Sequence, residues 1–347
     1  MMQISPETQL FIREHSSDDV RVLALQAKKY PDIDMPTAIT QIAGRKVAAE
    51  KIPSWWEIEK IWYPKHLSLE QCSSEITARY KARLLQGDSL TDLTGGFGID
   101  CSFLATGFKS ATYVERQEEL CEIAAHNFPV LNLNHINIKN EDGVTYLQVM
   151  SPVDCLFLDP ARRNEHGGKT VAISDCEPNV AELEELLLQK ANRVMIKLSP
   201  MLDLSLALKE LKQTQEVHIL SVNNECKELL ILLGQTSPAE ISIHCVNLFT
   251  KGTQKEQHFV FTREQEQCSE CTYTDSLETY LYEPNASLLK AGAFRSIAAA
   301  YPVRKLHPNS HLYTSDTFIE NFPGRIFRIV NQCSFNKKEV KENLADL

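Results

Sequence analysis

The stretch SLTDLTGGFGID, residues 89–100, decides the fold. It starts as a short apolar run, and three glycines within four residues then lead into a helix predicted near 99–106. Glycine lets the backbone turn sharply and come close to a bound nucleoside. The order strand, glycine turn, helix is typical of a doubly wound α/β domain that binds a nucleotide-like ligand.

Outward from this stretch, short apolar runs alternate with helical stretches over residues 71–235. This alternation predicts a parallel sheet with helices on both faces. The last two runs, 217–222 and 228–234, are separated by so few residues that the final strand is expected to be antiparallel. We therefore predict a doubly wound, seven-stranded, Rossmann-like domain, preceded by one amphipathic helix over 68–85.

The segments before and after this domain have different sequence patterns. Residues 1–70 are predicted to form a helical module, in which three nearby tryptophans are expected to pack rather than to bind bases. Residues 236–347 are predicted to be an α+β module that contains a strand pair, 241–248 and 257–263. The chain stops within a helix-like segment, so we expect a truncated sequence.

Composition limits the classes of function. The chain has 347 residues and a net charge of −10, which argues against a protein that coats nucleic acid indiscriminately. Residues 290–341 nevertheless hold nine Lys and Arg against three Asp and Glu, and could form either a phosphate-binding face or a solvated surface. The chain has neither a signal-peptide pattern nor an apolar run of about 20 residues, so we expect a cytoplasmic protein without membrane contact.

The ten cysteines are scattered, and only Cys268 and Cys271 have the spacing of metal ligands. A structural zinc ion needs four ligands, and no second pair follows. No metal is therefore expected.

Acidic residues follow the first three predicted strands. Glu115 can accept hydrogen bonds from ribose hydroxyls, and Asp142 can accept one from an adenine amino group. Asp92, three residues before the first glycine, suits a cationic amino-acid group and would repel a pyrophosphate. The predicted ligand-binding set is Asp92, Thr94, Gly95, Gly96, Phe97, Gly98, Glu115, Arg116 and Asp142.

The fourth strand ends in LDPARR, residues 158–163, at the sheet edge where ligands react in this fold. Asp159 and Pro160 are predicted to align the reacting group, while Arg162 and Arg163 are predicted to bind substrate phosphate. Lys197 ends the fifth strand and is included in the catalytic set. With Asp159, Lys81 and Glu225 it could deprotonate a ribose hydroxyl, or it could form a structural ion pair.

Nine stretches together resemble the class I S-adenosylmethionine-dependent methyltransferase family of Bacteroidetes-type bacteria with ferredoxin-like and THUMP-like C-terminal domains. They are 71–82, 92–100, 158–163, 167–178, 197–202, 221–230, 282–294, 307–316 and 322–327. The resemblance implies S-adenosylmethionine as cofactor, a ferredoxin-like module at about 275–317 and a THUMP-like module from about 318. It also implies RNA modification, with transfer or ribosomal RNA as substrate.

The chain departs from the Asp-Pro-Pro-aromatic motif of related enzymes, because Ala161 replaces the second proline and no aromatic residue follows. Two alternatives therefore stay open. One is a methyltransferase acting on a protein or a small molecule, and the other is a cofactor-binding protein without catalysis. The sequence does not indicate the oligomeric state.

Overall fold

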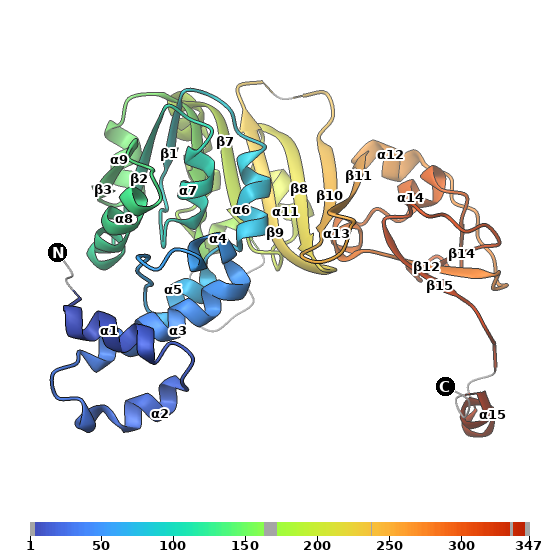
Figure 1. The fold of residues 1–347 in the computed structure, drawn as a ribbon. Coiled ribbons are helices and arrows are strands. Elements are labelled where there is room, and N and C mark those ends of the chain that lie inside the picture. Colours follow the sequence, from blue (N-terminus) through green and yellow to red (C-terminus); the bar gives the residue numbers. More distant parts are fainter. Residues whose placement is uncertain (1–3, 163–171, 237, 334–335, 344–347) are drawn as a thin grey trace. The chain divides into compact units, whose positions relative to one another are not determined.

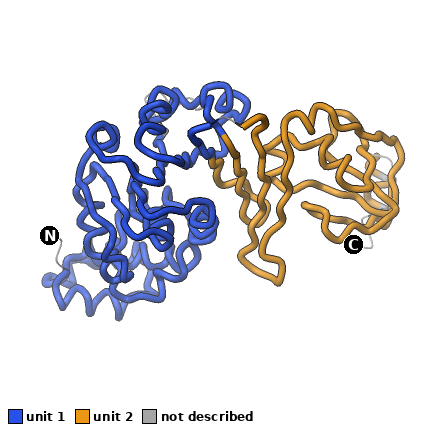
Figure 2. Tube along the Cα trace, turned by 90° about the horizontal axis from the view of Figure 1, so that it is seen from above, with its two compact units in different colours: residues 1–214, 231–237 blue, residues 215–230, 238–347 orange. Residues whose placement is uncertain are grey.

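The structure, a computed structural model, describes residues 4–162, 172–236, 238–333 and 336–343. The chain divides into two compact units (Figure 2). Unit 1 comprises residues 1–214 and 231–237, and unit 2 comprises residues 215–230 and 238–347. None of the helices described is both long enough and apolar enough to cross a membrane.

Unit 1 begins with the predicted helices. Ser5 caps the first and Asp34 caps the third, and each has a proline in its first turn. Trp55 and Tyr63 pack with Phe97 of the glycine turn in one buried cluster, which confirms packing as the role of Trp55. The helices are α1 (Pro6–Glu14), α2 (Val20–Leu25), α3 (Met35–Lys51), α4 (Pro53–Trp56), α5 (His66–Gln71) and α6 (Glu75–Ala82), with a 3₁₀ turn at Ala27–Lys29.

The single helix predicted over 68–85 is wrong, because two helices, α5 and α6, occupy this stretch. Cys72 and Ser74 adopt extended backbone angles and interrupt the helical hydrogen bonds. Serine favours such positions because its hydroxyl can bond to nearby polar groups in place of the helix ladder. The break leaves Ser73 outside both helices.

The sheet of unit 1 is parallel and has the strand order β7-β4-β1-β2-β3 (Figure 1). Its strands are β1 (Ser89–Asp92), β2 (Ser110–Glu115), β3 (Ile136–Asn140), β4 (Val153–Leu158) and β7 (Ala191–Leu198). The helices that follow the strands are α7 (Ile99–Ala105), α8 (Glu118–Val130), α9 (Gly143–Val149), α10 (Val180–Lys190) and α11 (Leu204–Glu210). Because the strands run the same way, their carboxyl ends meet at one edge.

A small two-stranded ribbon and a 3₁₀ turn lie between β4 and β7 in the sequence. Strands β5 (Ala161–Arg162) and β6 (Cys176–Glu177) pair antiparallel, and a 3₁₀ turn at Ile173–Asp175 precedes β6. β5 begins two residues after Asp159, so the ribbon starts at the carboxyl end of β4.

Strand β8 (Thr214–Val222) lies almost wholly in unit 2, and β9 (Glu225–Gly234) begins in unit 2 and ends in unit 1. The two strands are joined by Asn223 and Asn224, which both have positive φ angles. Such a two-residue turn makes an antiparallel hairpin, as predicted for the last strands. The order continues as β9-β8-β10-β11, where β10 (Ser242–Leu248) is parallel to β8 and antiparallel to β11 (Glu256–Thr262). The strand pair predicted after the seven-stranded domain is therefore present as β10 and β11. These two strands extend the sheet beyond the seven strands that the sequence predicts.

The rest of unit 2 is α+β. A four-stranded antiparallel sheet has the order β13-β14-β12-β15. Its strands are β12 (Tyr280–Pro284), β13 (Arg304–Lys305), β14 (Tyr313–Ser315) and β15 (Gly324–Arg328). The helices are α12 (Arg263–Cys268), α13 (Ala286–Ala291), α14 (Arg295–Ala300) and α15 (Lys337–Asn343).

Candidate active site

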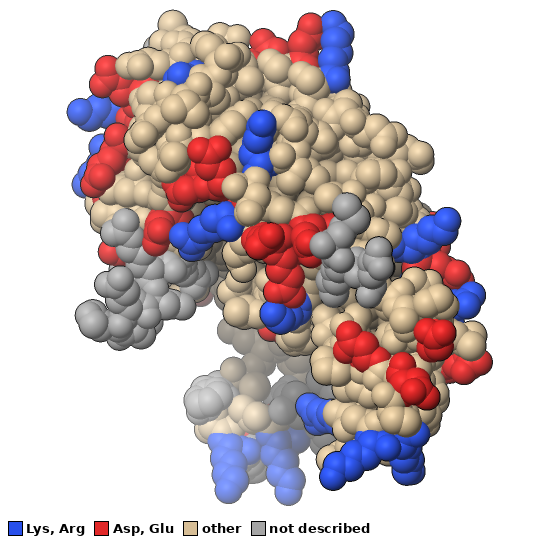
Figure 3. Space-filling view, turned by 90° about the vertical axis from the view of Figure 1, so that its left-hand side faces the viewer, with Lys and Arg blue, Asp and Glu red and all other residues tan. Residues whose placement is uncertain are grey.

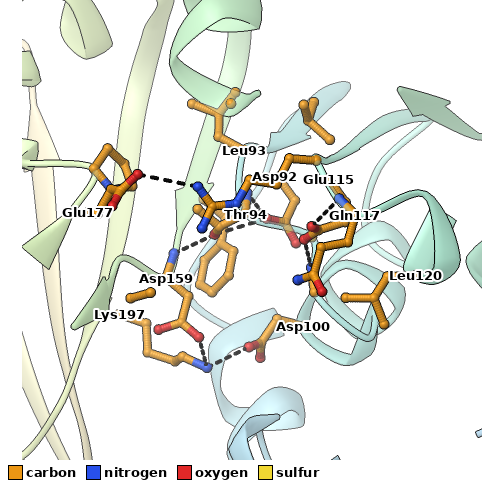
Figure 4. A pocket seen from close by; sticks show the side chains of 18 of the residues that line it. Asp92, Leu93, Thr94, Asp100, Glu115, Gln117, Leu120, Asp159, Glu177 and Lys197 are labelled. Carbon is orange, nitrogen blue, oxygen red and sulfur yellow. Dashed lines mark hydrogen bonds and ion pairs between the residues drawn. The ribbon is translucent and has the colours of Figure 1, made fainter. Parts of the chain in front are cut away.

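A cavity of about 540 Å³ lies in unit 1 at the carboxyl ends of β1, β2, β4 and β7 (Figure 4). All nine residues of the predicted ligand-binding set line it, together with Asp159 and Lys197. Pro160 is buried and is not among the lining residues. The side chain of Arg162 and the whole of Arg163 lie outside the described residues. The parallel sheet thus gathers strand ends that are far apart in the sequence.

The glycine turn forms one wall of the cavity. A Cβ atom on Gly95 would lie 2.2 Å from the ring of Tyr113, so only glycine fits at this close approach. Gly96 has a φ of 53°, and a Cβ there would meet no atom closer than 3.8 Å. The backbone of this turn is therefore bare toward the cavity, as close contact with a ligand requires.

Glu115 fastens the glycine turn to the end of β2. Its Oε2 accepts a hydrogen bond of 2.9 Å from the amide of Gly96, and its Oε1 accepts one of 2.8 Å from the amide of Gln117. The residue is 8% exposed. Each oxygen of an ionised carboxylate has two acceptor positions, so these bonds leave capacity for hydroxyl donors from a ligand.

Three other side chains of the predicted ligand-binding set are also held by contacts within the protein. Phe97 packs edge-on against Trp55, with ring centroids 5.2 Å apart, so only its backbone is suited to contact a ligand. Asp142 caps α9 through Oδ1, which accepts from the amides of Val144 and Thr145. Arg116 pairs with Glu177 across the cavity wall at 3.3 Å (Figure 4).

Asp92 ends β1 and is fully buried. Its Oδ1 accepts a hydrogen bond of 2.9 Å from the amide of Thr94, whereas its buried Oδ2 has no hydrogen-bond partner among the described residues. Burial raises the pKa of Asp92 to about 8, and the nearby acids Asp100 and Asp159 add to the shift. A carboxyl group in this setting is suited to receive a cation or a hydrogen-bond donor from a ligand.

Asp159 follows β4 and is fixed at both its backbone and its side chain. Its amide donates a hydrogen bond of 2.6 Å to Oγ1 of Thr94, and its Oδ2 lies 2.6 Å from Nζ of Lys197 (Figure 4). The side chain is 37% exposed, so it can reach a second molecule. Loss of water around the carboxyl group raises the pKa of Asp159, although Lys197 opposes this shift.

Two lysines and a serine surround Asp100, and with it they form what we call the Asp100 network. Lys197 lies 3.1 Å from Oδ2 of Asp100, and Lys81 lies 3.0 Å from Oδ1. Ser73 donates to Asp100 at 2.7 Å and accepts from Lys81 and Lys197 at 2.8 and 3.0 Å. Burial alone would raise the pKa of Asp100, but the two lysines and Ser73 outweigh it, and the pKa is lowered.

This network differs from the group that the sequence suggested around Lys197. Glu225 is exposed in unit 2 and pairs with Lys227 at 2.6 Å. Within unit 1, the acids that pair with the lysines are Asp100 and Asp159. Sequence reasoning missed Asp100, although its position in the first turn of the helix that follows the glycines is a usable signal.

A solved structure resembles this protein over the whole chain. It is the crystal structure of a "putative methyltransferase" from Porphyromonas gingivalis W83, which is 33% identical, covers 100% of this chain and 88% of its own, and superposes with a TM-score of 0.86. The chain belongs to this methyltransferase family. Within it, residues 280–323 match the model of a ferredoxin-like domain.

Two other solved methyltransferases are similar to this family member over less than half of its length. An rRNA methylase from Streptococcus thermophilus is 15% identical, covers 46% of this chain and 93% of its own, and has a TM-score of 0.34. A "putative methyltransferase" from Streptococcus mutans in complex with SAH is 14% identical, covers 46% and 96%, and has a TM-score of 0.33. Both likenesses are too remote to carry a functional argument. No protein of curated function matches the chain in sequence.

Proposed function

We propose that this member of the methyltransferase family uses S-adenosylmethionine to methylate RNA, with a base nitrogen of transfer or ribosomal RNA as the acceptor. One observation carries the proposal. Asp159, a partly exposed carboxylate at the end of β4, is tied through Thr94 to the glycine turn that walls the same cavity. Asp159, which would hold the acceptor, is thereby linked to the glycine turn, which would hold the cofactor.

The residues of the cavity fit the cofactor. The unpartnered Oδ2 of Asp92 suits its cationic amino-acid end, Glu115 suits its ribose hydroxyls, and the bare backbone at Gly96 permits close approach of the nucleoside. A cavity of about 540 Å³ falls within the usual range for small-molecule sites, roughly 300–1,000 Å³. When bound, the cofactor supplies an electrophilic methyl group.

The protein's own contribution would be alignment of the acceptor. Oδ2 of Asp159 is held by Lys197, so the carboxylate has a fixed direction from which to accept a hydrogen bond from an amino group. Lys197 contacts Asp159, Asp100 and Ser73, and an ammonium group has three protons to donate. We therefore assign Lys197 as a positioning residue rather than a base, which favours a nitrogen over a ribose hydroxyl.

RNA as the substrate is supported by the family resemblance and by the basic residues of unit 2, but three of these are used within the protein. Arg304 pairs with Glu278, Arg325 pairs with Glu283 at 2.6 Å, and Lys305 is buried. On the face seen in Figure 3, acidic and basic side chains are mixed over the upper part, and Lys and Arg gather at the lower edge. These pairings favour the second candidate, a methyltransferase of a protein or a small molecule.

Nucleoside mass spectrometry on RNA from cells with and without the gene tests the substrate. We expect one methylated nucleoside to disappear with the gene and to return with the wild-type chain or Asp32→Asn, a change of an exposed acid. Asp159→Asn is expected not to restore it. Unchanged RNA, combined with methylated protein or metabolite, would favour the second candidate.

Calorimetry with the cofactor separates binding from catalysis. We expect Asp159→Asn to bind S-adenosylmethionine like the wild type while transferring at least about 100-fold less methyl group. Wild-type protein that binds the cofactor but labels nothing would support a cofactor-binding protein without catalysis. Protein that binds neither the cofactor nor its demethylated product would remove the proposal altogether.

A further inference from the structure

Unit 2 contains a row of histidines that has no role in the proposed methyl transfer. In the sheet register His218 of β8 lies beside His244 of β10, and Glu216 lies beside Ser242. Successive strand residues alternate between the two faces of a sheet, so Glu216, His218 and His244 share one face. His258 of β11, opposite Val246, joins the same face one step along.

The side chains of this row are in contact. The rings of His218 and His244 stack with centroids 4.3 Å apart, and Nε2 of His218 lies 3.2 Å from Oε2 of Glu216. Nδ1 of His244 lies 3.2 Å from Nε2 of His258. One ligand atom each from Glu216, His218 and His244 lie within 4.8 Å of one another.

We propose that Glu216, His218 and His244 form a binding site for a divalent transition-metal ion of the zinc type. Two imidazole nitrogens and a carboxylate oxygen are a donor set that zinc uses in proteins, with a position left for a further ligand. Zn–N bonds of about 2.0–2.1 Å in a tetrahedral site place neighbouring donors about 3.3 Å apart. The 3.2 Å between His218 and Glu216 matches this spacing.

The chemistry of the donors supports the same assignment. A metal ion binds neutral imidazole and an ionised carboxylate. Glu216 supplies a negative charge that neither His218 nor His244 can supply.

His258 is the outer member of the row. Its Nε2 is within hydrogen-bond distance of Nδ1 of His244, and a second imidazole in this place fixes the tautomer and orientation of a ligand histidine. We assign His258 as a positioning residue. The proposed ion would link strand β8 to strand β10 and would take no part in methyl transfer.

The test is a zinc titration of the untagged full-length chain, stripped with a chelator, in competition with a chromophoric zinc indicator. We expect one Zn²⁺ per chain. Affinity should fall at least about 100-fold in His244→Ala and at least tenfold in the near-isosteric Glu216→Gln, and about 10-fold in His258→Ala. Cobalt substitution should give the intense visible absorption of a tetrahedral site in the wild type only.

Controls separate this site from other binding and from misfolding. The double variant Cys268→Ser, Cys271→Ser removes the pair with metal-ligand spacing in the same unit and should bind zinc like the wild type. Circular dichroism checks that Glu216→Gln is folded, and zinc should raise the melting temperature of the wild type but not of this variant. Equal zinc affinity of the wild type, Glu216→Gln and His244→Ala would overturn the proposal, as would loss of binding in the cysteine variant alone. The row would then be a stack of packed rings.

Discussion

Two carboxylates on either side of the glycine turn are both buried, yet they have opposite electrostatic character. Asp92 has one unpartnered oxygen, and burial raises its pKa to about 8. Asp100 lies between Lys81 and Lys197, and its pKa is lowered. Partner charges, rather than burial itself, therefore decide which acid is ionised at neutral pH.

The difference indicates what each acid is for. Asp100 already has its cations within the fold, so it serves to hold the elements around the cavity together. Both acids line the cavity, but among the described residues no cation pairs directly with Asp92, so its electrostatic requirement would be met by a ligand. Five experiments can break or sharpen this division between an internal acid and a ligand-directed one.

The largest effect is expected for Asp100→Asn. It leaves Lys81 and Lys197 buried near each other without the carboxylate that joins them, and breaking a buried ion pair by removing one partner typically costs about 3–5 kcal/mol. Denaturant unfolding measures this loss. Adding Lys81→Met to the same variant should recover part of it, whereas a loss below about 1 kcal/mol would show that Asp100 is not the internal anchor.

Asp92→Asn should weaken cofactor binding but stabilise the ligand-free protein at pH 7, because the buried wild-type carboxyl group must keep a proton there that the unfolded chain releases. The isosteric amide keeps an acceptor for the amide of Thr94 and removes the negative charge that a cationic ligand would meet. A hydrogen bond to a charged group contributes about 1.5–3 kcal/mol, which is about 10–100-fold in affinity. Calorimetry at pH 8 tests this expectation, and equal affinities would assign Asp92 to the fold rather than to the ligand.

The pH dependence of binding follows from the raised pKa. Asp92 is ionised mainly above pH 8, and a cation binds to the ionised form, so affinity should rise from pH 6 to pH 8 and then level off. With a pKa of about 8, affinity at pH 7 should be about fivefold lower than at pH 8. Titration across this range checks it, and Asp92→Asn should give a flat profile.

The stability of the protein without ligand offers a control with the opposite sign. The carboxyl group of Asp92 ionises near pH 4 in the unfolded chain but only near pH 8 in the folded one. The wild type should therefore lose stability relative to Asp92→Asn as the pH rises from about 4 to 8. A constant difference between the two proteins would contradict a raised pKa.

The smallest effect is expected at the exposed pair of Arg116 and Glu177. Their side chains are 63% and 53% exposed, and surface ion pairs contribute about 0–1 kcal/mol. Arg116→Gln should thus change the free energy of unfolding by less than about 1 kcal/mol. If Arg116→Gln lost as much stability as Asp100→Asn, exposure would not distinguish this surface ion pair from the buried ion pairs of Asp100.

The strand ends could be predicted from the sequence, because parallel strands bring their carboxyl ends together whatever the loops do. For this reason Asp92, Glu115, Asp159 and Lys197 line one cavity. The similar solved structure confirms the predicted family and its α/β fold. The roles of the individual site residues stay predictions.

The rest of the site depends on packing that periodicity does not reveal. Residues 68–85 have an amphipathic pattern throughout, so the interruption that places Ser73 in the Asp100 network was not predicted. Phe97 lies within a ligand-binding motif, but its ring is needed by Trp55. The histidine row depends on the register between β8 and β10, which no local pattern specifies.

The interruption between α5 and α6 has a consequence for protein engineering. Ser73 contacts Lys81, Asp100 and Lys197 together, and it lies directly after the helical module of residues 1–70. A deletion that extends past α5 would therefore remove a hydroxyl from the Asp100 network. Even a cut at residue 70 would remove Trp55 and Tyr63, which pack with Phe97 of the glycine turn, so an exchange of the leading helices with those of another protein would have to preserve this packing.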